Sequence, residues 1–333
     1  MPTWQARAVA LLVRAVMRRQ TWGDERALAR RARRVFGPPR AFQWLRTRDV
    51  RIEAVRHGAV RGEWVTAACS DRGVVLYFHG GGYVAGSPAT DRPITAALAR
   101  LAGRRVFSLD YRLAPEHRFP AAVDDAIGAY RWLLGHGVAP RALALAGQSA
   151  GGGLVLATLL RLRDEGVPLP AAAVCISPWT DLAGTGASLH GNDGRCATFR
   201  PGNIADFARA YVGDGAPLSP YASPVLADFH GLPPVLFHVG SIELLLDDAR
   251  RVHEKILRAG GASRLEVFDG LFHSWHMMDG VVPEARAALE RAAAFVNEAG
   301  GREGPQTPTR SEPPRRSRGG PRPSAVSDQR FCQ

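Results

Sequence analysis

Ser149 is the residue best placed for covalent chemistry, because it lies in the small-residue sequence Gly147-Gln148-Ser149-Ala150-Gly151. A short apolar run at 142–146 precedes this motif, and a stretch with helical spacing follows it. A serine in a tight strand-to-helix turn needs small neighbours, since the chain there passes close to itself. The helix start offers unpaired N–H groups to a developing oxyanion. The motif predicts a nucleophile; the alternative is a serine that only caps the helix.

A second glycine-rich segment follows the apolar run at 74–78 and reads His79-Gly80-Gly81-Gly82. Consecutive glycines let backbone N–H groups turn toward a substrate carbonyl without side-chain clashes. A phosphate-binding loop is the rival interpretation, but no Gly-Lys-Ser/Thr follows and the spacing GxGxxG is absent. We therefore expect an oxyanion-binding loop, in which His79 holds the backbone by hydrogen bonds.

A serine nucleophile needs a base, and the base needs a carboxylate that orients it. Among ten histidines, His273 lies in the loop after the run at 265–268, at the end of the chain order serine, acid, histidine. His276, three residues further on, is a minor rival. The acid is expected between 241 and 248, after the apolar run at 235–239. That segment contains Glu243, Asp247 and Asp248, and the last two are typical of a helix start.

The elements that must position these side chains alternate along the chain. Short apolar runs are separated by stretches with helical spacing, at 90–102, 121–134, 151–164, 247–259 and 284–299. Buried strands that alternate with helices predict an α/β fold with a mostly parallel central sheet flanked by helices. Period-two alternation from residue 50 to 68 predicts an initial hairpin or meander. Residues 183–232 contain no clear strand and are interpreted as an insertion that lies over the sheet.

The two ends of the chain differ from its centre in composition and charge. The net charge of +12 divides into +9 for residues 1–49, +4 for 301–333 and −1 for the centre, and only one of 43 basic residues is a lysine. The basic ends therefore do not predict a nucleic-acid partner. We expect a helical cap segment at 1–45, a catalytic domain at 46–300 with a cap insertion at about 183–220, and a disordered, proline-rich tail at 301–333.

The predicted first helix, 4–17, gathers apolar side chains near one face: Trp4, Ala8, Leu11, Leu12, Ala15 and Val16. Contact of this face with a membrane surface is open but not favoured, because packing against the body explains it equally well. No apolar run is long enough for a membrane span, and the N-terminus does not have the form of a signal peptide. Four widely separated cysteines indicate neither a zinc site nor a disulfide framework. These features predict a cytoplasmic protein.

Together these motifs resemble the hormone-sensitive-lipase-like branch of the α/β-hydrolases, a group of carboxylesterases. The resemblance covers roughly 60–300 and extends beyond the two glycine-rich motifs to five further segments, 110–116, 119–121, 177–182, 232–234 and 240–248. It implies an α/β-hydrolase fold with a helical cap. It also implies that the N–H groups of Gly81, Gly82 and Ala150 form an oxyanion hole, that His79 and Gly80 support its loop, and that His273 is the base.

The resemblance favours Glu243 as the acid, with Asp247 as the alternative. The family commonly has aspartate at the acid position, and it commonly has aspartate where this chain has Gln148. Glutamate can do the same work with a small backbone shift. A dense charged block is interpreted as a buried ion-pair network that braces the loop: Asp110, Arg112, Glu116, Asp124 and Asp125.

The resulting hypothesis is a serine carboxylic-ester hydrolase that cleaves short-acyl esters through an acyl-enzyme, with the triad Ser149, Glu243 and His273. We expect no cofactor and no catalytic metal. A lactone hydrolase or a small-molecule deacetylase on the same site is the first alternative. A non-catalytic binding protein of the same fold is the second, and the presence of His273 argues against it. A homodimer remains open.

Overall fold

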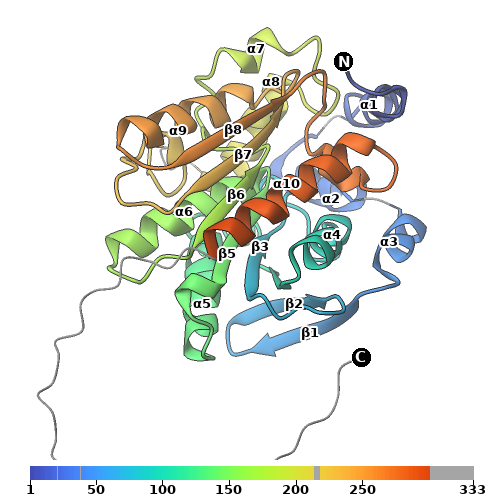
Figure 1. The fold of residues 1–333 in the computed structure, drawn as a ribbon. Helices are drawn as coiled ribbons and strands as arrows, with labels where there is room; N and C mark the ends of the chain where they lie inside the picture. Colours follow the sequence, from blue (N-terminus) through green and yellow to red (C-terminus); the bar gives the residue numbers. More distant parts are fainter. Residues whose placement is uncertain (21, 38, 214–217, 301–333) are drawn as a thin grey trace, which may run out of the picture. The chain divides into compact units, whose positions relative to one another are not determined.

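The computed structural model describes residues 1–20, 22–37, 39–213 and 218–300, so the predicted tail at 301–333 lies outside the described residues. An eight-stranded sheet runs through its centre in the order β1-β2-β4-β3-β5-β6-β7-β8 (Figure 1). The β1–β2 and β2–β4 pairs are antiparallel and the other pairs are parallel. The strands are β1 (Arg51–His57), β2 (Val60–Thr66), β3 (Val74–Phe78), β4 (Arg105–Leu109), β5 (Leu143–Gln148), β6 (Ala172–Ile176), β7 (Val235–Gly240) and β8 (Ser263–Phe268).

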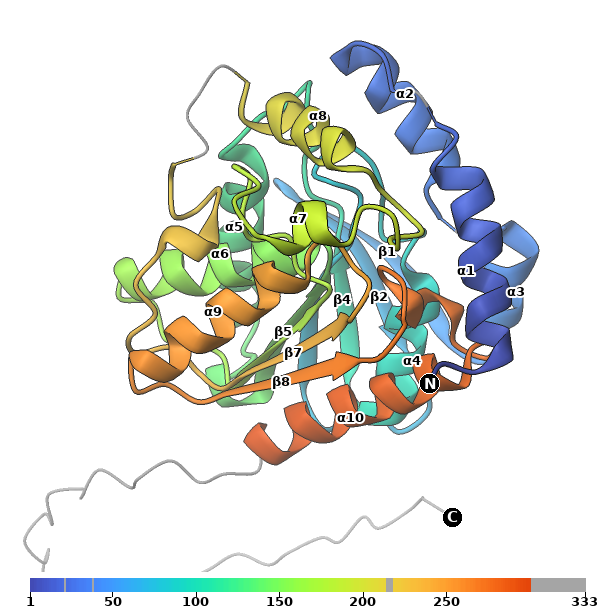
Figure 2. The ribbon, with the colours of Figure 1, turned by 90° about the horizontal axis from the view of Figure 1, so that it is seen from above.

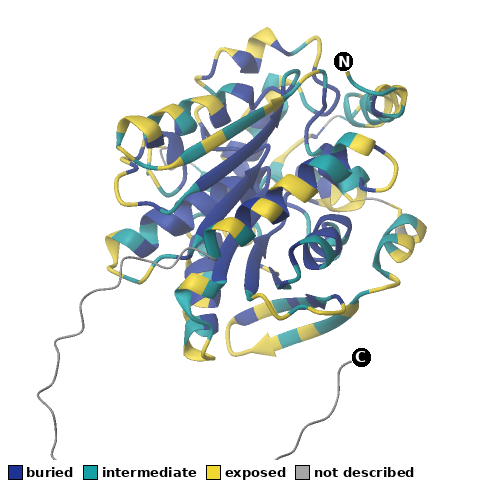
Figure 3. Cartoon of the chain, in the orientation of Figure 1, coloured by how far each residue is buried: buried dark blue, intermediate teal, exposed yellow. Residues whose placement is uncertain are grey.

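Helices cover both faces of the sheet. Val75 and Tyr77 of β3 pack in the cluster formed with α4 and α10, whereas Leu76 and Phe78 pack in the cluster formed with α5, α6 and α9. This alternation follows from the two-residue period of a strand. Figure 3 shows the central strands as buried. The flanking helices are α4 (Arg92–Ala102), α5 (Ala121–Gly135), α6 (Ala150–Asp164), α9 (Leu246–Arg258) and α10 (Pro283–Gly300).

The predicted elements of the body are confirmed. Each expected strand and helix is present, with ends that differ by at most two residues, and the expected hairpin is β1–β2. The insertion contains no strand in its described residues; its regular elements there are two helices, α7 (Ser188–Gly191) and α8 (Pro201–Val212), and one short 3-10 turn, Pro224–Leu226. The strands β3, β5, β6 and β7 are parallel, so the loops that follow them lie at the same edge of the sheet, at the carboxyl ends of the strands. The predicted site residues are expected at this edge.

Three helices precede the sheet and lie along one side of the molecule in Figure 2: α1 (Trp4–Met17), α2 (Glu25–Val35) and α3 (Arg40–Thr47). The sequence predicted α1 with the observed bounds and missed α3. The expected packing of α1 is wrong, because its predicted apolar face points outward: Trp4, Leu11 and Leu12 are exposed. The inner side is formed instead by Ala6, Val9, Ala10 and Val13, which pack against the body.

The charged block is also different from the prediction. Arg112 pairs with Asp125 at 2.7 Å, and Glu116 pairs with Arg33 of α2 at 2.6 Å, but three of these four side chains are more than a third exposed. The block therefore forms separate surface ion pairs rather than one buried network. Such exposed pairs contribute little stability. Among the described residues, no helix is long and apolar enough to cross a membrane.

Candidate active site

Ser149 lies in a sharp turn between β5 and α6. Its φ of 55° and ψ of −121° are unusual for a residue with a side chain, so the turn is strained. A Cβ on Gly147 would lie 2.3 Å from the carbonyl oxygen of Gly151, and one on Gly151 would lie 2.1 Å from that of Phe78. The two glycines are therefore required by close backbone approach. Ser149 makes no side-chain cap hydrogen bond to α6, which does not fit the alternative of a simple helix cap.

Three side chains from different loops meet in one hydrogen-bonded chain. His273 Nε2 lies 2.9 Å from Ser149 Oγ, and His273 Nδ1 lies 2.6 Å from Glu243 Oε2. Ser149 and His273 are 8% exposed, and Glu243 is fully buried. A proton on Nδ1, facing the carboxylate, leaves Nε2 as the acceptor for the serine hydroxyl. The arrangement can activate a hydroxyl and store its proton.

Glu243 is held by groups that the sequence did not single out as site residues. Its Oε1 accepts hydrogen bonds from Gly240 N at 2.6 Å and from Ser177 Oγ at 2.8 Å, while Asn192 Nδ2 donates to its backbone carbonyl at 2.9 Å. Ser177 directly follows β6, at the same sheet edge as Ser149, and this position could have indicated it. Asn192 lies in the insertion, where no periodic pattern points to a role.

The rival acid and the rival base lie elsewhere. Asp247 accepts a hydrogen bond from Ser188 N at 2.8 Å. Its neighbour Asp248 accepts from the backbone of Thr180 at 2.7 Å, and burial raises the pKa of Asp248 to about 7. His276 is fully buried, with Nε2 hydrogen-bonded to Nδ1 of His238 at 3.1 Å. Burial holds the pKa of His276 well below its ordinary value, so this ring is neutral.

The glycine loop after β3 and the first residue of α6 together provide three backbone N–H groups as possible donors. Within the described part of the chain, the N–H groups of Gly81, Gly82 and Ala150 have no hydrogen-bond partner. Gly81 and Gly82 have φ values of 121° and 63°, which favour glycine. A Cβ on Gly81 would lie 2.1 Å from the Ala85 carbonyl oxygen, and one on Gly82 would lie 2.5 Å from the Phe207 ring. Free donors at the start of α6 can bind an oxyanion.

His79 lies inside this loop as a neutral ring. Its Nδ1 donates to the Gly80 carbonyl at 2.7 Å, and its ring stacks on Tyr111 with centroids 4.1 Å apart. Tyr111 Oη donates in turn to the His79 carbonyl at 2.8 Å. Burial lowers the pKa of His79 to about 4. These contacts fix the loop backbone from within.

Gln148 lies beside a buried carboxylate, Asp91. Asp91 accepts hydrogen bonds from Tyr77 Oη at 2.8 Å, from Gly80 N at 3.2 Å and from Gln148 Nε2 at 3.4 Å, and burial raises its pKa to about 6. A carboxylate at position 148 would face a second carboxylate here. The amide donates to Asp91 instead, which is a physical reason for glutamine at this position.

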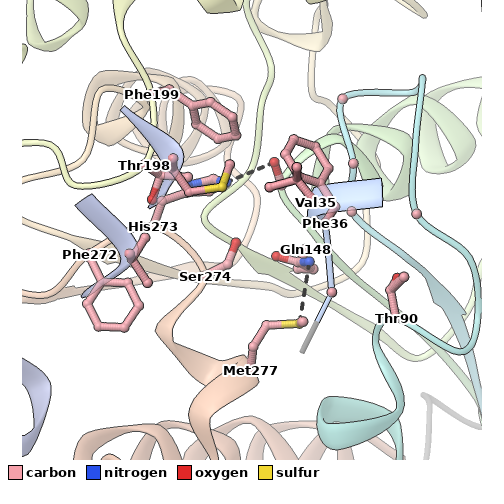
Figure 4. A pocket seen from close by; sticks show the side chains of 18 of the residues that line it. Val35, Phe36, Thr90, Gln148, Thr198, Phe199, Phe272, His273, Ser274 and Met277 are labelled. Carbon is pink, nitrogen blue, oxygen red and sulfur yellow. Dashed lines mark hydrogen bonds between the residues drawn. The ribbon is translucent and has the colours of Figure 1, made fainter. Parts of the chain in front are cut away.

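A cavity of about 400 Å³ opens above Ser149. Its walls are mostly apolar and come from the N-terminal helices, the insertion and the loop that contains His273; they include Val13, Met17, Phe36, Phe199, Phe207 and Phe272. Figure 4 shows Gln148 and Ser274 in this wall, near Met277. Neither Gln148 Oε1 nor Ser274 Oγ has a hydrogen-bond partner among the described residues.

The sequence pattern of the alpha/beta hydrolase fold matches residues 75–277, most of the chain. This chain belongs to the α/β-hydrolase family. An acetyl-hydrolase of Streptomyces hygroscopicus is 46% identical over 249 residues, 75% of this chain and 83% of the relative. An esterase of Acinetobacter venetianus is 35% identical over 248 residues, 74% of this chain and 82% of the relative.

Solved structures give the same assignment. An esterase from the bacterial hormone-sensitive lipase family is 41% identical and aligns with a TM-score of 0.80, over 90% of this α/β-hydrolase and 100% of that chain. EstE5, in a crystal soaked with p-nitrophenyl butyrate, is 37% identical and aligns with a TM-score of 0.82, over 90% of this chain and 99% of that chain. The resemblance to hormone-sensitive-lipase-like esterases is confirmed. The protein is a serine ester hydrolase of the carboxylesterase class.

Proposed function

We propose that Ser149, His273 and Glu243 are the catalytic triad of this esterase. The hydrogen-bonded chain from Ser149 Oγ through His273 to Glu243, at 2.9 and 2.6 Å, is the observation that carries the proposal. As Ser149 Oγ bonds to the ester carbonyl carbon, His273 Nε2 takes the hydroxyl proton. Glu243 stabilises the resulting imidazolium and fixes its tautomer.

Gly81, Gly82 and Ala150 are the proposed oxyanion donors. Their free N–H groups bind the carbonyl oxygen as it becomes negative, and the tetrahedral intermediate then collapses. The bond from the carbonyl carbon to the alcohol oxygen breaks, and His273 gives its proton to the leaving alkoxide. Water then attacks the acyl-enzyme with His273 as base, which releases the acid and restores the Ser149 hydroxyl. His79 and Gly80 support the loop.

Short-acyl esters are the proposed substrates. Bulky side chains line the cavity, among them Phe199, Phe207 and Phe272, and its volume of about 400 Å³ leaves room for a small ester. The relative named acetyl-hydrolase supports a short acyl group and keeps small-molecule deacetylation as the second candidate. Residues 1–45 and 183–220 are the proposed cap. Their helices supply the walls around the nucleophile, whereas the catalytic domain at 46–300 supplies the triad.

A reducing, cytoplasmic location is also proposed. Three of the four cysteines lie in the described residues, and all three are free thiols: Cys69, Cys175 and Cys196. Unpaired cysteines are typical of a reducing compartment.

A series of p-nitrophenyl esters with increasing acyl length tests the proposed substrate class. We expect kcat/KM to be highest for short acyl chains and to fall as the chain lengthens. Ser149→Ala, with an unchanged melting temperature, provides the background rate. Better hydrolysis of a long-chain triglyceride emulsion than of a short ester would contradict the proposal.

A further inference from the structure

Exposed apolar side chains are concentrated at the N-terminal side of the molecule. Of twelve exposed large apolar residues in the described chain, seven lie within residues 1–45. Trp4, Leu11 and Leu12 of α1 are 74%, 68% and 66% exposed, and Trp44 and Leu45 of α3 are 67% and 47% exposed. We define these five residues as the N-terminal face. Exposed apolar side chains gathered in this way, two tryptophans among them, mark an interaction surface.

The helix α1 is apolar on two sides. Ala6, Val9 and Val13 pack inward, against the cluster that includes α10. Trp4 and Leu11, seven residues apart, lie on the opposite side together with Ala8 and Ala15. A helix that is apolar on two sides needs two apolar partners, and the body supplies only one. Figures 1 and 2 both place α1 and α3 at the same side of the molecule.

The N-terminal face is accompanied by uncompensated positive charge. No acidic residue occurs in 1–23 or in 40–48. Within the described residues, Arg7, Arg19 and Arg48 have no ion-pair partner, whereas Arg18 pairs with Asp193 and Arg46 with Asp279. Arginine can extend its charged end to phosphate while its apolar stem lies along a membrane surface. A second copy of this chain would bring the same unpaired arginines together, which disfavours it as the partner.

The N-terminal face borders the opening of the catalytic cavity. Leu12 and Val16 are exposed and also line the cavity, and Pro39, directly before α3, lines it as well. A partner surface that binds over α1 and α3 would therefore lie next to the opening through which an ester reaches Ser149.

We propose that the N-terminal face docks on an anionic lipid bilayer and holds the cavity opening at the lipid–water interface. Trp4, Leu11 and Trp44 insert among the lipid headgroups, and Arg7, Arg19 and Arg48 contact lipid phosphates. On the basis of the proposed function, we expect the substrates to be amphiphilic esters that partition into such a bilayer.

Flotation of the full chain with vesicles tests the docking. One set of vesicles is pure phosphatidylcholine, and the other contains phosphatidylglycerol as well. We expect binding to the anionic vesicles at low salt, and binding at least tenfold weaker to the neutral vesicles or at high salt. The double variant Leu11→Asp/Trp44→Asp should lose most of this binding. Leu257→Asp, which changes a half-exposed leucine of α9, is the matched control and should bind as the wild type does.

Equal binding by the double variant and the wild type would overturn the proposal, because the basic tail would then account for it. Light scattering provides a second test. A wild-type dimer that the double variant dissociates would identify the N-terminal face as a contact between two copies, and would also overturn the proposal. Melting curves establish that the variants are folded. Hydrolysis of p-nitrophenyl acetate without vesicles reports on the triad alone, so failure of docking and failure of catalysis are distinguishable.

Discussion

The neighbourhood of Ser149 and the walls above it are built differently. Around Ser149 the geometry is set by the backbone: glycines 147 and 151 are packed against carbonyl oxygens, and Glu243 has both carboxylate oxygens paired. The walls are built from side chains, with Phe36, Phe199 and Phe207 in mutual ring contacts. The first region tolerates almost no change of shape, whereas side chains in the second can be exchanged. We therefore expect substitutions around Ser149 to affect catalysis and substitutions in the walls to affect substrate choice.

Neutralising the acid should have the largest effect. Glu243→Gln keeps the side-chain shape but removes the charge that stabilises the imidazolium, so we expect turnover to fall by about 10² to 10⁴. Asp247→Asn should cost far less, mainly through lost contacts at the start of α9, where Asp247 accepts from Ser188. Steady-state kinetics on one short p-nitrophenyl ester measure both, with Ser149→Ala as the floor. If turnover fell to the floor with Asp247→Asn while Glu243→Gln stayed active, Asp247 rather than Glu243 would be the acid of the triad.

A change in the wall should alter selectivity rather than chemistry. Phe36→Leu removes a ring that stacks on Phe207, with centroids 5.9 Å apart, and enlarges the cavity. The ratio of kcat/KM for a hexanoate ester to that for an acetate ester should rise about 5- to 30-fold, equivalent to about one to two kcal/mol. An equal fall for both esters would show instead that the wall positions the triad.

A buried histidine in the sheet, His238, should make the free energy of unfolding depend on pH. The aromatic wall residues contain no such group and should not contribute to this dependence. Burial lowers the pKa of His238 to about 3, from 6.5. Between these values the unfolded chain binds more protons, so the contribution of neutral His238 is present above about pH 6.5 and is lost as the pH falls. In this range the free energy of unfolding should fall by about 1.4 kcal/mol for each pH unit of acidification.

Urea unfolding at pH 7 and pH 5 measures that slope. His238→Gln, which keeps a hydrogen-bonding group beside His276, should lose less stability on acidification than the wild type. Phe36→Leu should keep the wild-type dependence on pH. The same slope in His238→Gln and in the wild type would show that His238 is already accessible to protons.

Removal of the tail should have the smallest effect. Residues 302–333 contain few apolar side chains to offset the entropy cost of ordering them. A chain that ends at Gly301 should keep both its melting temperature and its esterase activity. A fall of several degrees in a melting curve, or loss of most of the activity, would contradict this.

The sequence was most informative where chemistry and local structure coincide. The strand–Ser149–helix motif and the loop with His273 require particular residue types at particular spacings, so both could be located before the structure. The acid was less certain, because Glu243 and Asp247 lie on one short segment and only the path of that loop decides which carboxylate meets His273. Ser177 and Asn192 act on Glu243 from distant segments, and sequence spacing does not record such contacts.

The two wrong expectations have related causes. The apolar pattern of α1 predicts packing of the side that holds Trp4, but Ala6 and Val13 form the inner side and Trp4 faces outward. Periodicity identifies which side chains share a side of a helix, not which side meets the body. Similarly, the charged block between Asp110 and Asp125 predicted pairing, yet charge alone does not show whether a pair is buried.

The identity of the nucleophile is tested most directly by trapping the acyl-enzyme. The enzyme is mixed with an excess of a short p-nitrophenyl ester, quenched in acid and digested, and the peptides are examined by mass spectrometry. The account predicts a burst of p-nitrophenol with one acyl group per chain, attached to Ser149 and absent in Ser149→Ala. An acyl group on another residue, or turnover that persists undiminished in Ser149→Ala, would contradict the proposed mechanism.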